Sequence, residues 1–351
     1  MCPAMRVLVT GGAGFIGSQY VRMMLAGDFP GTPRPHVTVL DKLTYAGNLA
    51  NLEPVSGSDN FTFIRGDICD AALMASVVPG HDTIINFAAE THVDRSITGA
   101  RPFVETNVMG VQTLLDACLE AGVRRVVQVS TDEVYGSVNQ GSWAEDAAME
   151  PNSPYAASKA GGDLIARAYA RTHGLDVRVT RCCNNYGPYQ FPEKIIPLFI
   201  TNLLDGLGVP VYGDGKNIRS WVHVADHCRG IQVVLERGEP GGIYHIGGDW
   251  ELSNLELTRA ILDCCGFSWD KVEYVPDRKG HDRRYSLDYS LLRNLGYAPR
   301  INFEEGLGAT MRWYRDNRGW WEPLKRASSH GHGVGSGSTT GTSQDGNGHR
   351  Q

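Results

Sequence analysis

The sequence lacks the features that mark several large classes of protein. None of its apolar runs approaches the roughly twenty residues of a membrane-spanning helix. Residues 1–6 lead directly into an apolar run at 7–9, without the segment typical of a signal peptide. No block of Lys or Arg accompanies the formal net charge of −6, which argues against a general nucleic-acid surface. We therefore expect a cytoplasmic protein with neither a membrane nor a nucleic-acid partner.

Cysteine is too sparse for a disulfide scaffold. The 8 cysteines of the 351-residue chain include the adjacent pairs Cys182-Cys183 and Cys264-Cys265, but no Cys-x-x-Cys suited to zinc or redox chemistry. We interpret them as reduced structural thiols and assign no metal site. The histidines near the C-terminus, at positions 330, 332 and 349, are interpreted as solvated residues.

The first half of the chain alternates short apolar runs with longer amphipathic ones. Strands are predicted at residues 6–10, 36–41, 61–65, 82–87, 125–130 and 176–181, and helices at 14–26, 70–78, 103–122 and 154–173. This alternation is typical of repeated βαβ units on a parallel sheet. The sequence therefore predicts an α/β fold, with a Rossmann-type doubly wound parallel sheet formed by residues 1–181.

The second half has a looser pattern, with Gly, Pro and aromatic residues in clusters. Residues 182–326 are predicted to form mainly a smaller α/β substrate-binding domain, partly interleaved with the first. Helices are expected there at residues 194–205, 224–237, 254–265 and 304–317. Residues 327–351 are rich in Ser, Gly, His and Thr and cannot bury enough apolar surface to offset ordering, so they are predicted to form a disordered tail.

A glycine-rich loop follows the first strand and opens the first helix. Gly11, Gly14 and Gly17 fit the G-x-x-G-x-x-G form of the dinucleotide-binding loop, where glycine permits a tight turn and close approach to the pyrophosphate. The helix N-terminus offers unpaired N–H groups to the phosphates. Asp41 ends the second strand, where a carboxylate accepts hydrogen bonds from the adenosine ribose and repels a 2′-phosphate. We therefore predict NAD as the cofactor rather than NADP.

The ends of the next two strands extend this predicted cofactor site. Asp67 and Ile68 follow the third strand, where they would border the adenine. Ala88 and Ala89 end the fourth strand with small side chains, which suits close passage of backbone past a cofactor. For Asp67, an N-cap of the following helix is the competing interpretation.

Two short motifs supply groups for proton transfer. Thr131, Asp132 and Glu133 come directly after the strand at 125–130. Tyr155 and Lys159 are one helical turn apart and face the same way. Either motif alone would be read as ordinary surface residues, but both accompany a cofactor loop. Together they indicate an enzyme that oxidises, eliminates and reduces on one substrate.

Over residues 5–325 the chain resembles the extended short-chain dehydrogenase/reductase superfamily, in the branch that acts on nucleotide sugars. The matching segments are residues 41–48, 88–96, 130–136, 155–159, 184–188, 192–194, 219–221 and 277–285. Within the superfamily these motifs are similar to those of dTDP-glucose 4,6-dehydratases. The Thr-Asp-Glu triplet is specific, because epimerases and decarboxylases of the same fold usually lack the acid pair. Lys279 departs from the pattern, since Pro is usual there.

The resemblance implies a role for each group in the two motifs. Tyr155 would take the proton of the sugar 4-hydroxyl, while Lys159 would hold the nicotinamide ribose and lower the pKa of the tyrosine. Asp132 would be the acid for the departing 6-hydroxyl and Glu133 the base for the C5 proton. Thr131 would hydrogen-bond the 4-oxygen.

The resemblance also implies binding residues and an oligomeric state. Further cofactor contacts would come from Phe15, Ile16, Lys42, Thr44, Thr106 and Asn185. Substrate contacts would come from Thr91, Thr131, Asn184, Lys194, Arg219, Asn254, Arg278 and His281, with Pro210 and Tyr212 lining the nucleobase pocket. The family pairs the helices expected at 103–122 and 154–173 into a four-helix bundle, so a homodimer is expected.

Elementary chemistry supports the implied order of steps. A sugar C5–H is not acidic until C4 is a ketone, so oxidation must precede elimination, and hydroxide leaves C6 only with a proton donor. The expected reaction is NAD-dependent dehydration of dTDP-glucose to dTDP-4-keto-6-deoxyglucose, with return of the hydride to C6. A 4,6-dehydratase or epimerase of another nucleotide sugar is an alternative. A non-catalytic NAD-binding protein is a third, although it would need neither motif.

Overall fold

A seven-stranded sheet, all of whose strand pairs are parallel, forms the centre of the computed structural model, which describes residues 5–32, 34–277 and 280–330. The strand order is β10-β6-β5-β4-β1-β2-β3. The strands are β1 (Arg6–Thr10), β2 (His36–Asp41), β3 (Phe61–Arg65), β4 (Thr83–Asn86), β5 (Arg125–Thr131), β6 (Val177–Cys182) and β10 (Ile243–Ile246). The order reverses between β1 and β4, which is the switch point where ligands bind in open α/β sheets. The predicted Rossmann-type doubly wound sheet is confirmed.

Helices cover both faces of this sheet because the strand side chains alternate between two apolar cores. Val7 and Val9 pack in the core under α1 (Phe15–Ala26), α8 (Val224–Arg237) and α10 (Ser290–Asn294). Leu8 points the other way, into the core under α2 (Ala71–Val77), α5 (Val111–Glu120) and α6 (Pro154–His173). The near-continuous apolar strands of the sequence therefore reflect burial on both faces.

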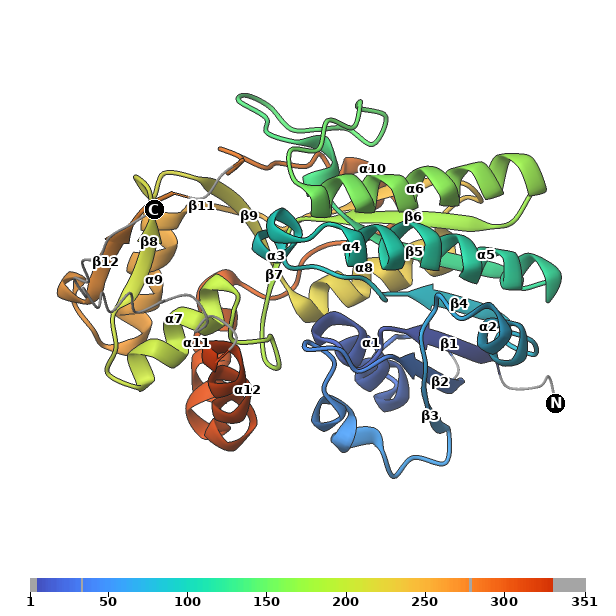
Figure 1. The fold of residues 1–351 in the computed structure, drawn as a ribbon, viewed down its shortest axis with the longest axis horizontal. Coiled ribbons are helices and arrows are strands. Elements are labelled where there is room, and N and C mark those ends of the chain that lie inside the picture. The colour runs from blue at the N-terminus through green and yellow to red at the C-terminus, as the bar shows by residue number, and fades with distance from the viewer. Residues whose placement is uncertain (1–4, 33, 278–279, 331–351) are drawn as a thin grey trace, which may run out of the picture.

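A third core lies beyond one end of the sheet, on the left of Figure 1. Its helices are α7 (Ile195–Leu204), α9 (Asn254–Cys265), α11 (Phe303–Asp316) and α12 (Arg318–His330). β7 (Asn184–Tyr186), β9 (Ile218–His223) and β11 (Trp250–Ser253) form a three-stranded sheet, and β8 (Val209–Tyr212) pairs with β12 (Val272–Val275). Within the described residues, no helix combines the length and the apolar character needed to cross a bilayer.

The two halves interleave along the chain. β10 and α8 come from the second half of the sequence, yet β10 is the edge strand beside β6 and α8 packs on α1. In Figure 1 the yellow α8 lies next to the blue α1 of the first half. The expected helices of the second half appear within one residue of their predicted bounds.

The helix predicted at 103–122 is interrupted. α4 (Arg101–Val104) and α5 are joined by a π-helical turn, η2 (Glu105–Gly110). The buried side chain of Asn107 lies in this turn and donates to the Glu90 carbonyl at 3.0 Å and to Ser158 Oγ at 2.8 Å. The π-helical turn therefore directs the polar side chain of Asn107 into the protein, toward Glu90 and Ser158. The apolar pattern of the sequence did not predict this. Short elements complete the fold: α3 (Val93–Thr98) and the 3₁₀ turns η1 (Leu49–Val55), η3 (Asp132–Tyr135) and η4 (Trp269–Lys271).

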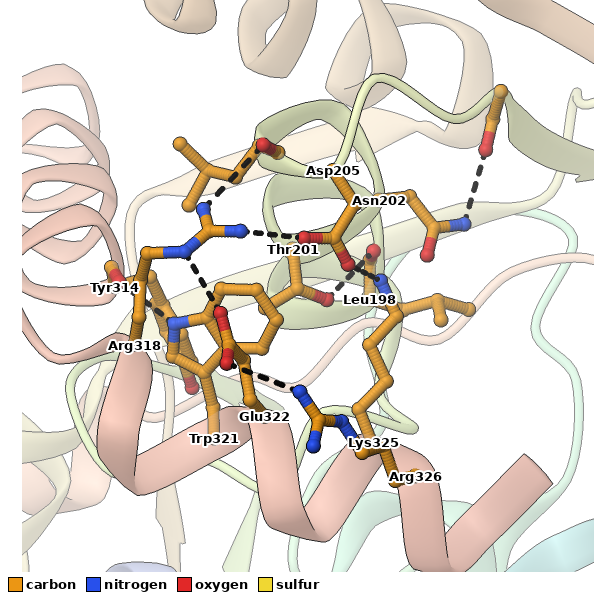
Figure 2. Close-up of polar contacts among 12 residues, drawn as sticks. Leu198, Thr201, Asn202, Asp205, Tyr314, Arg318, Trp321, Glu322, Lys325 and Arg326 are labelled. Carbon is orange, nitrogen blue, oxygen red and sulfur yellow. Dashed lines mark hydrogen bonds and ion pairs between the residues drawn. The ribbon is translucent and has the colours of Figure 1, made fainter. Parts of the chain in front are cut away.

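Helix α12 corrects the predicted start of the tail. It continues through residue 330, so residues 327–330 are helical rather than disordered. The helix is anchored because Trp321 is fully buried and donates from Nε1 to the Tyr314 carbonyl at 2.7 Å. Arg318 and Lys325 also converge on Asp205, each at 2.7 Å (Figure 2). The rest of the predicted tail, residues 331–351, lies outside the described part of the chain.

Candidate active site

A cavity of about 350 Å³ lies at the carboxyl ends of the parallel strands, around the switch point. Every predicted catalytic residue lines it: Thr131, Asp132, Glu133, Tyr155 and Lys159. So does every predicted cofactor-binding residue: Gly11, Gly14, Phe15, Ile16, Gly17, Asp41, Lys42, Thr44, Asp67, Ile68, Ala88, Ala89, Thr106 and Asn185, with Tyr155 and Lys159. The fold therefore gathers segments that are far apart in the sequence around one space.

In the glycine loop, the backbone at Gly11 and Gly17 packs too closely against its neighbours for any residue with a Cβ atom. Gly11 has φ +67°, and a Cβ there would lie 2.5 Å from the Ala88 nitrogen. A Cβ on Gly17 would lie 2.5 Å from the Gly11 carbonyl oxygen, where α1 crosses β1. Gly14 caps α1 without a side-chain hydrogen bond. The free N–H groups of the first turn and the narrow backbone suit a diphosphate.

The predicted ribose end of the cavity carries negative charge. Asp41 accepts from Ala13 N at 2.9 Å and from Leu43 N at 2.8 Å, so its carboxylate also fixes the glycine loop to β2. Lys42 Nζ lies 2.6 Å from a carboxylate oxygen of Asp67, so the positive charge of Lys42 is neutralised by this ion pair. The N-cap interpretation of Asp67 is wrong, because Asp70 caps α2 by accepting from the Leu73 nitrogen.

The acid pair follows β5 on the 3₁₀ turn η3. Asp132 is only 3% exposed, and one of its oxygens, Oδ2, has no hydrogen-bond partner among the described residues. Burial, and then the charge of Glu133, raises the pKa of Asp132 to about 8, against an opposing effect of Arg219. Thr131 Oγ1 lies 3.3 Å from Asp132 Oδ1. Burial therefore favours the protonated form of Asp132, and Glu133 is its half-buried neighbour.

Tyr155 and Lys159 lie on the first turns of α6, which Ser153 caps by accepting from the Ala156 nitrogen. Lys159 Nζ donates to the Val129 carbonyl at 2.7 Å, and burial lowers its pKa to about 8, against an opposing effect of Asp163. Burial, and then the charge of Glu133, raises the pKa of Tyr155 well above its usual value. Among the protein's own groups, the effects that raise the pKa of Tyr155 therefore outweigh those that lower it.

Buried charged and polar groups connect the two motifs. Arg181 Nε binds Asp163 Oδ2 at 2.9 Å, and both side chains are buried. Arg181 also donates to the hydroxyl of Tyr135, which in turn lies 2.7 Å from His245 Nε2. Tyr135 belongs to the turn that carries Asp132, whereas Asp163 follows Lys159 by one turn of α6. The network therefore fixes η3 against α6, β6 and β10.

The predicted substrate residues divide into two groups. Thr91, Asn184 and Lys194 line the cavity, and Lys194 Nζ donates to the Thr91 carbonyl at 3.3 Å. Arg219 does not line the cavity: it is buried on β9, where it donates to the Asp282 carbonyl at 2.9 Å and has a lowering effect on the pKa of Asp132. The second group, Pro210, Tyr212, Asn254 and His281, does not line this cavity but lies in the smaller half, at β8, the start of α9 and the loop after β12. Arg278 lies outside the described residues.

Several lining residues escaped the sequence analysis. They are Glu90, Gln190, Phe191, Glu193, Trp221 and His227, among others. Glu90, Glu193 and Trp221 lie within segments that carry the family resemblance, at 88–96, 192–194 and 219–221, but no role was assigned to them there. His227 is buried, its Nδ1 lies 2.9 Å from Asn185 Oδ1, and burial lowers its pKa to about 3. In the part of the chain that the structure describes, no group of three or more His, Cys, Asp or Glu side chains is placed to hold a metal ion.

Comparison with known proteins identifies relatives along most of the chain. The family model described as GDP-mannose 4,6 dehydratase matches residues 8–310. A dTDP-glucose 4,6-dehydratase from Streptomyces niveus is 61% identical over 322 residues, covering 92% of this chain and 96% of the relative. One from an Actinoplanes species is 59% identical over 320 residues, covering 90% and 100%.

Solved structures of proteins with the same fold include relatives from the same group of enzymes. The dTDP-glucose 4,6-dehydratase DesIV from Streptomyces venezuelae, with NAD and TYD bound, superposes with a TM-score of 0.90 at 64% identity, covering 91% of this chain and all of that one. A UDP-glucose 4-epimerase from Thermotoga maritima has a TM-score of 0.82 but only 30% identity, over 90% of this chain and 100% of that one. The chain therefore belongs to the family described as GDP-mannose 4,6 dehydratase and, within it, to the dTDP-glucose 4,6-dehydratases.

Proposed function

We propose that this chain is an NAD-dependent dTDP-glucose 4,6-dehydratase, a hydro-lyase that forms dTDP-4-keto-6-deoxyglucose. The observation that carries the proposal is the buried carboxyl group of Asp132 beside Glu133, in one cavity with Tyr155 and the glycine loop. An epimerase needs no acid to expel a hydroxyl group, so this pair favours elimination. Relatives about 60% identical along nine tenths of the chain bear the same name.

The cavity suits NAD. The glycine loop would hold its diphosphate and Asp41 its adenosine ribose, while Lys159 would hold the nicotinamide ribose. When bound, oxidised NAD accepts a hydride from sugar C4 and returns it to C6. The carboxylate of Asp41 disfavours the extra phosphate of NADP, and the ammonium of Lys42 is already paired with Asp67.

Tyr155 would take the proton of the 4-hydroxyl. Its burial beside Glu133 raises its pKa, so a cation close to the hydroxyl is needed for it to act near neutral pH. One positive charge at about 4 Å contributes about 4 kcal/mol at an effective dielectric near 20, which corresponds to roughly three pKa units. Lys159 contributes from α6, but its ammonium already donates to the Val129 carbonyl, so the charge of the oxidised nicotinamide is required as well.

Asp132 and Glu133 would carry out the elimination. Glu133 takes the proton from C5, the C6–O bond breaks, and Asp132 gives its proton to the departing oxygen, so that water leaves. Thr131 hydrogen-bonds the 4-oxygen as the ketone forms. C5 then regains a proton as the hydride reaches C6. The proton taken by Tyr155 balances the one given by Asp132, so the net change is the loss of one water.

The smaller half would bind the nucleotide. Lys194 and Arg219 supply positive charge near the cavity, which suits a diphosphate, and we assign Arg278 and His281 to the same role. Pro210 and Tyr212 would line the nucleobase pocket. Thr91, Asn184 and Asn254 would supply the remaining polar contacts to the substrate.

We further propose a homodimeric, cytoplasmic enzyme. Large apolar side chains are exposed on the neighbouring helical segments α4, η2 and α6: Val104 is 46% exposed, Met109 57% and Leu164 53%. An apolar face of this kind is typical of a protein interface. A second copy of the chain would cover it by pairing the same helices.

A panel of nucleotide sugars tests the function. The enzyme is incubated with dTDP-, UDP- and GDP-hexoses without added reductant, and the products are analysed by mass spectrometry. Loss of one water from dTDP-glucose is expected. A product of unchanged mass would instead favour an epimerase, and no product from any sugar would favour a non-catalytic NAD-binding protein.

A further inference from the structure

The proposed reaction returns its hydride to the sugar from which it came, so the cofactor has no need to leave between turnovers. A protein with this chemistry can close its cofactor cavity with fixed contacts. The C-terminal helices α11 and α12 make contacts of this kind. The inference below rests on the proposed function and concerns residues outside the catalytic motifs.

One chain of hydrogen bonds runs from α12 to the glycine loop. Trp320 Nε1 donates to Asn51 Oδ1 at 3.0 Å, and Asn51 Nδ2 donates to the Ala13 carbonyl at 2.9 Å. Asn51 lies on η1 and is only 1% exposed. An indole N–H can only donate, so Trp320 and the Ala13 carbonyl together satisfy both ends of this amide. A residue near the C-terminus thereby fixes the loop that we assign to the cofactor diphosphate.

A second set of contacts runs from the same helices to Tyr189, next to another segment of the cavity lining. The ring of Tyr189 lies 4.4 Å from that of Trp313 and 5.7 Å from that of Trp320, measured between centroids. The Arg22 guanidinium lies 4.2 Å over the Tyr189 ring and also donates to the Asn51 carbonyl at 2.6 Å. The two sets of contacts therefore meet at Asn51.

The backbone conformation of Tyr189 is energetically unfavourable, so the contacts around this residue must stabilise it. Its φ of +67° is unfavourable for a residue that is not glycine, and such conformations persist only where surrounding contacts enforce them. The next residue, Gln190, lines the cavity. Gln190 donates to the Asn185 carbonyl at 2.9 Å, and its own carbonyl accepts from the Tyr314 hydroxyl.

We propose that Trp320 and Asn51 are positioning residues that fasten NAD in its cavity. They tie the glycine loop to the Tyr189–Gln190 segment, which also borders the cavity at Gln190, through helices that follow the rest of the fold in sequence. Neither residue lines the cavity. Their loss should therefore change how long NAD stays bound, and leave the chemical steps of the loaded enzyme almost unchanged.

The test compares Trp320→Phe with Trp269→Phe in the purified holoenzyme. Trp269 lies in the smaller half, where Arg259 stacks on its ring, and has no contact with the Asn51 network, so it controls for loss of an indole. NAD release is followed by exchange against isotopically labelled NAD. Because Trp320→Phe leaves a buried acceptor on Asn51 unpaired, we expect release roughly 10- to 100-fold faster than in the wild type. Trp269→Phe should release NAD at the wild-type rate.

A second variant covers the case in which Trp320→Phe does not fold. Asn51→Asp keeps the shape and the acceptor for Trp320, but it loses one of the two donors to the Ala13 carbonyl, and only the Asn48 nitrogen at 3.0 Å remains. This variant should also speed release. Wild-type retention in both variants would overturn the proposal, as would equal acceleration in Trp269→Phe. If the wild type dehydrates dTDP-glucose but Trp320→Phe retains NAD as long as the wild type does, only the proposed role of Trp320 in holding NAD is contradicted. A wild type that neither holds NAD nor turns over would contradict the proposed function itself.

Discussion

Asp132 is buried and adjoins a second carboxylate, and these two facts set its chemistry. Asp132→Asn keeps the shape but cannot donate the proton that the C6 hydroxyl needs in order to leave. Oxidation at C4 depends on Tyr155 and Lys159, so it should survive. The variant should show the absorbance of reduced nicotinamide on mixing with dTDP-glucose, while product forms roughly 10²–10⁴-fold more slowly.

Two further substitutions separate the steps. Glu133→Gln should slow elimination and suppress exchange of the C5 hydrogen with solvent, whereas Tyr155→Phe should block even the first reduction of the cofactor. If Asp132→Asn and Glu133→Gln turn over like the wild type, the acid pair is structural and the dehydratase assignment fails.

The same carboxyl group predicts a pH dependence. Its pKa is raised to about 8, so the protonated form that donates to the leaving group prevails at lower pH. The elimination rate in single turnovers should therefore be nearly constant up to about neutral pH and fall as the pH rises through 8. The residual elimination of Asp132→Asn should lack this decline. An elimination rate that rises through pH 8 in the wild type would show that the ionised form of Asp132 is the active one.

Asp41 should control the choice between NAD and NADP. Its carboxylate accepts from Ala13 and Leu43 as well as facing the cavity, so Asp41→Ser should weaken the binding of both cofactors. Repulsion of a 2′-phosphate is lost at the same time, so the ratio of NAD to NADP affinity should fall. Calorimetric titration of the cofactor-free protein measures both. A wild type that binds the two cofactors equally well would contradict this interpretation of the end of β2.

Much of this site was predictable because its groups lie next to strand ends. Asp41, Asp132 and the glycines follow apolar strands directly, so local sequence places them at one edge of the sheet. The state of Tyr155 was not predictable, because the charge of Glu133 and the bond from Lys159 to Val129 arise only after folding. The nucleotide contacts in the smaller half depend on long loops, which no periodic pattern describes.

Among the elements, helices with one apolar stripe were predicted within a residue or two. η2 was not, since a π-helical turn in the middle of a helix leaves the apolar repeat almost unchanged. α12 was missed because its sequence is polar apart from a few side chains, and its anchor, Trp321, is buried by contacts with segments far away along the chain.

Helix α12 and the residues after it should respond differently to removal. Truncation after His330 should leave the melting temperature and turnover unchanged, because every described anchor of the helix is retained. Trp321→Ala should instead cost about 3–5 kcal/mol of stability, as expected for a fully buried tryptophan. Thermal unfolding of both variants measures the difference. A large loss on truncation would show that residues 331–351 fold onto the body of the enzyme.

For the whole molecule, the exposed apolar face predicts the assembly. Leu164→Glu should leave the protomer folded, because the side chain is 53% exposed, but should convert a dimer to a monomer in light scattering. Leu207→Glu, which is also 53% exposed but lies in the smaller half, is the matched control and should stay dimeric. A wild type that is monomeric at micromolar concentration would contradict the proposed dimer.

The position of β10 in the sheet has a consequence for biosynthesis. β10 is formed by residues 243–246, yet it supplies His245 to the network that fixes the turn of Asp132 and Glu133. A nascent chain that has emerged only as far as β6 lacks this edge strand, α8 and one partner of Tyr135, His245, although it already contains the other, Arg181. The ribosome must therefore deliver at least 246 of the 351 residues, about 70% of the polypeptide, before the seven-stranded sheet is complete. Nucleotide capture thus belongs to the late stages of synthesis, and a proteolytic cut between β6 and α8 would not release a self-sufficient NAD-binding fragment.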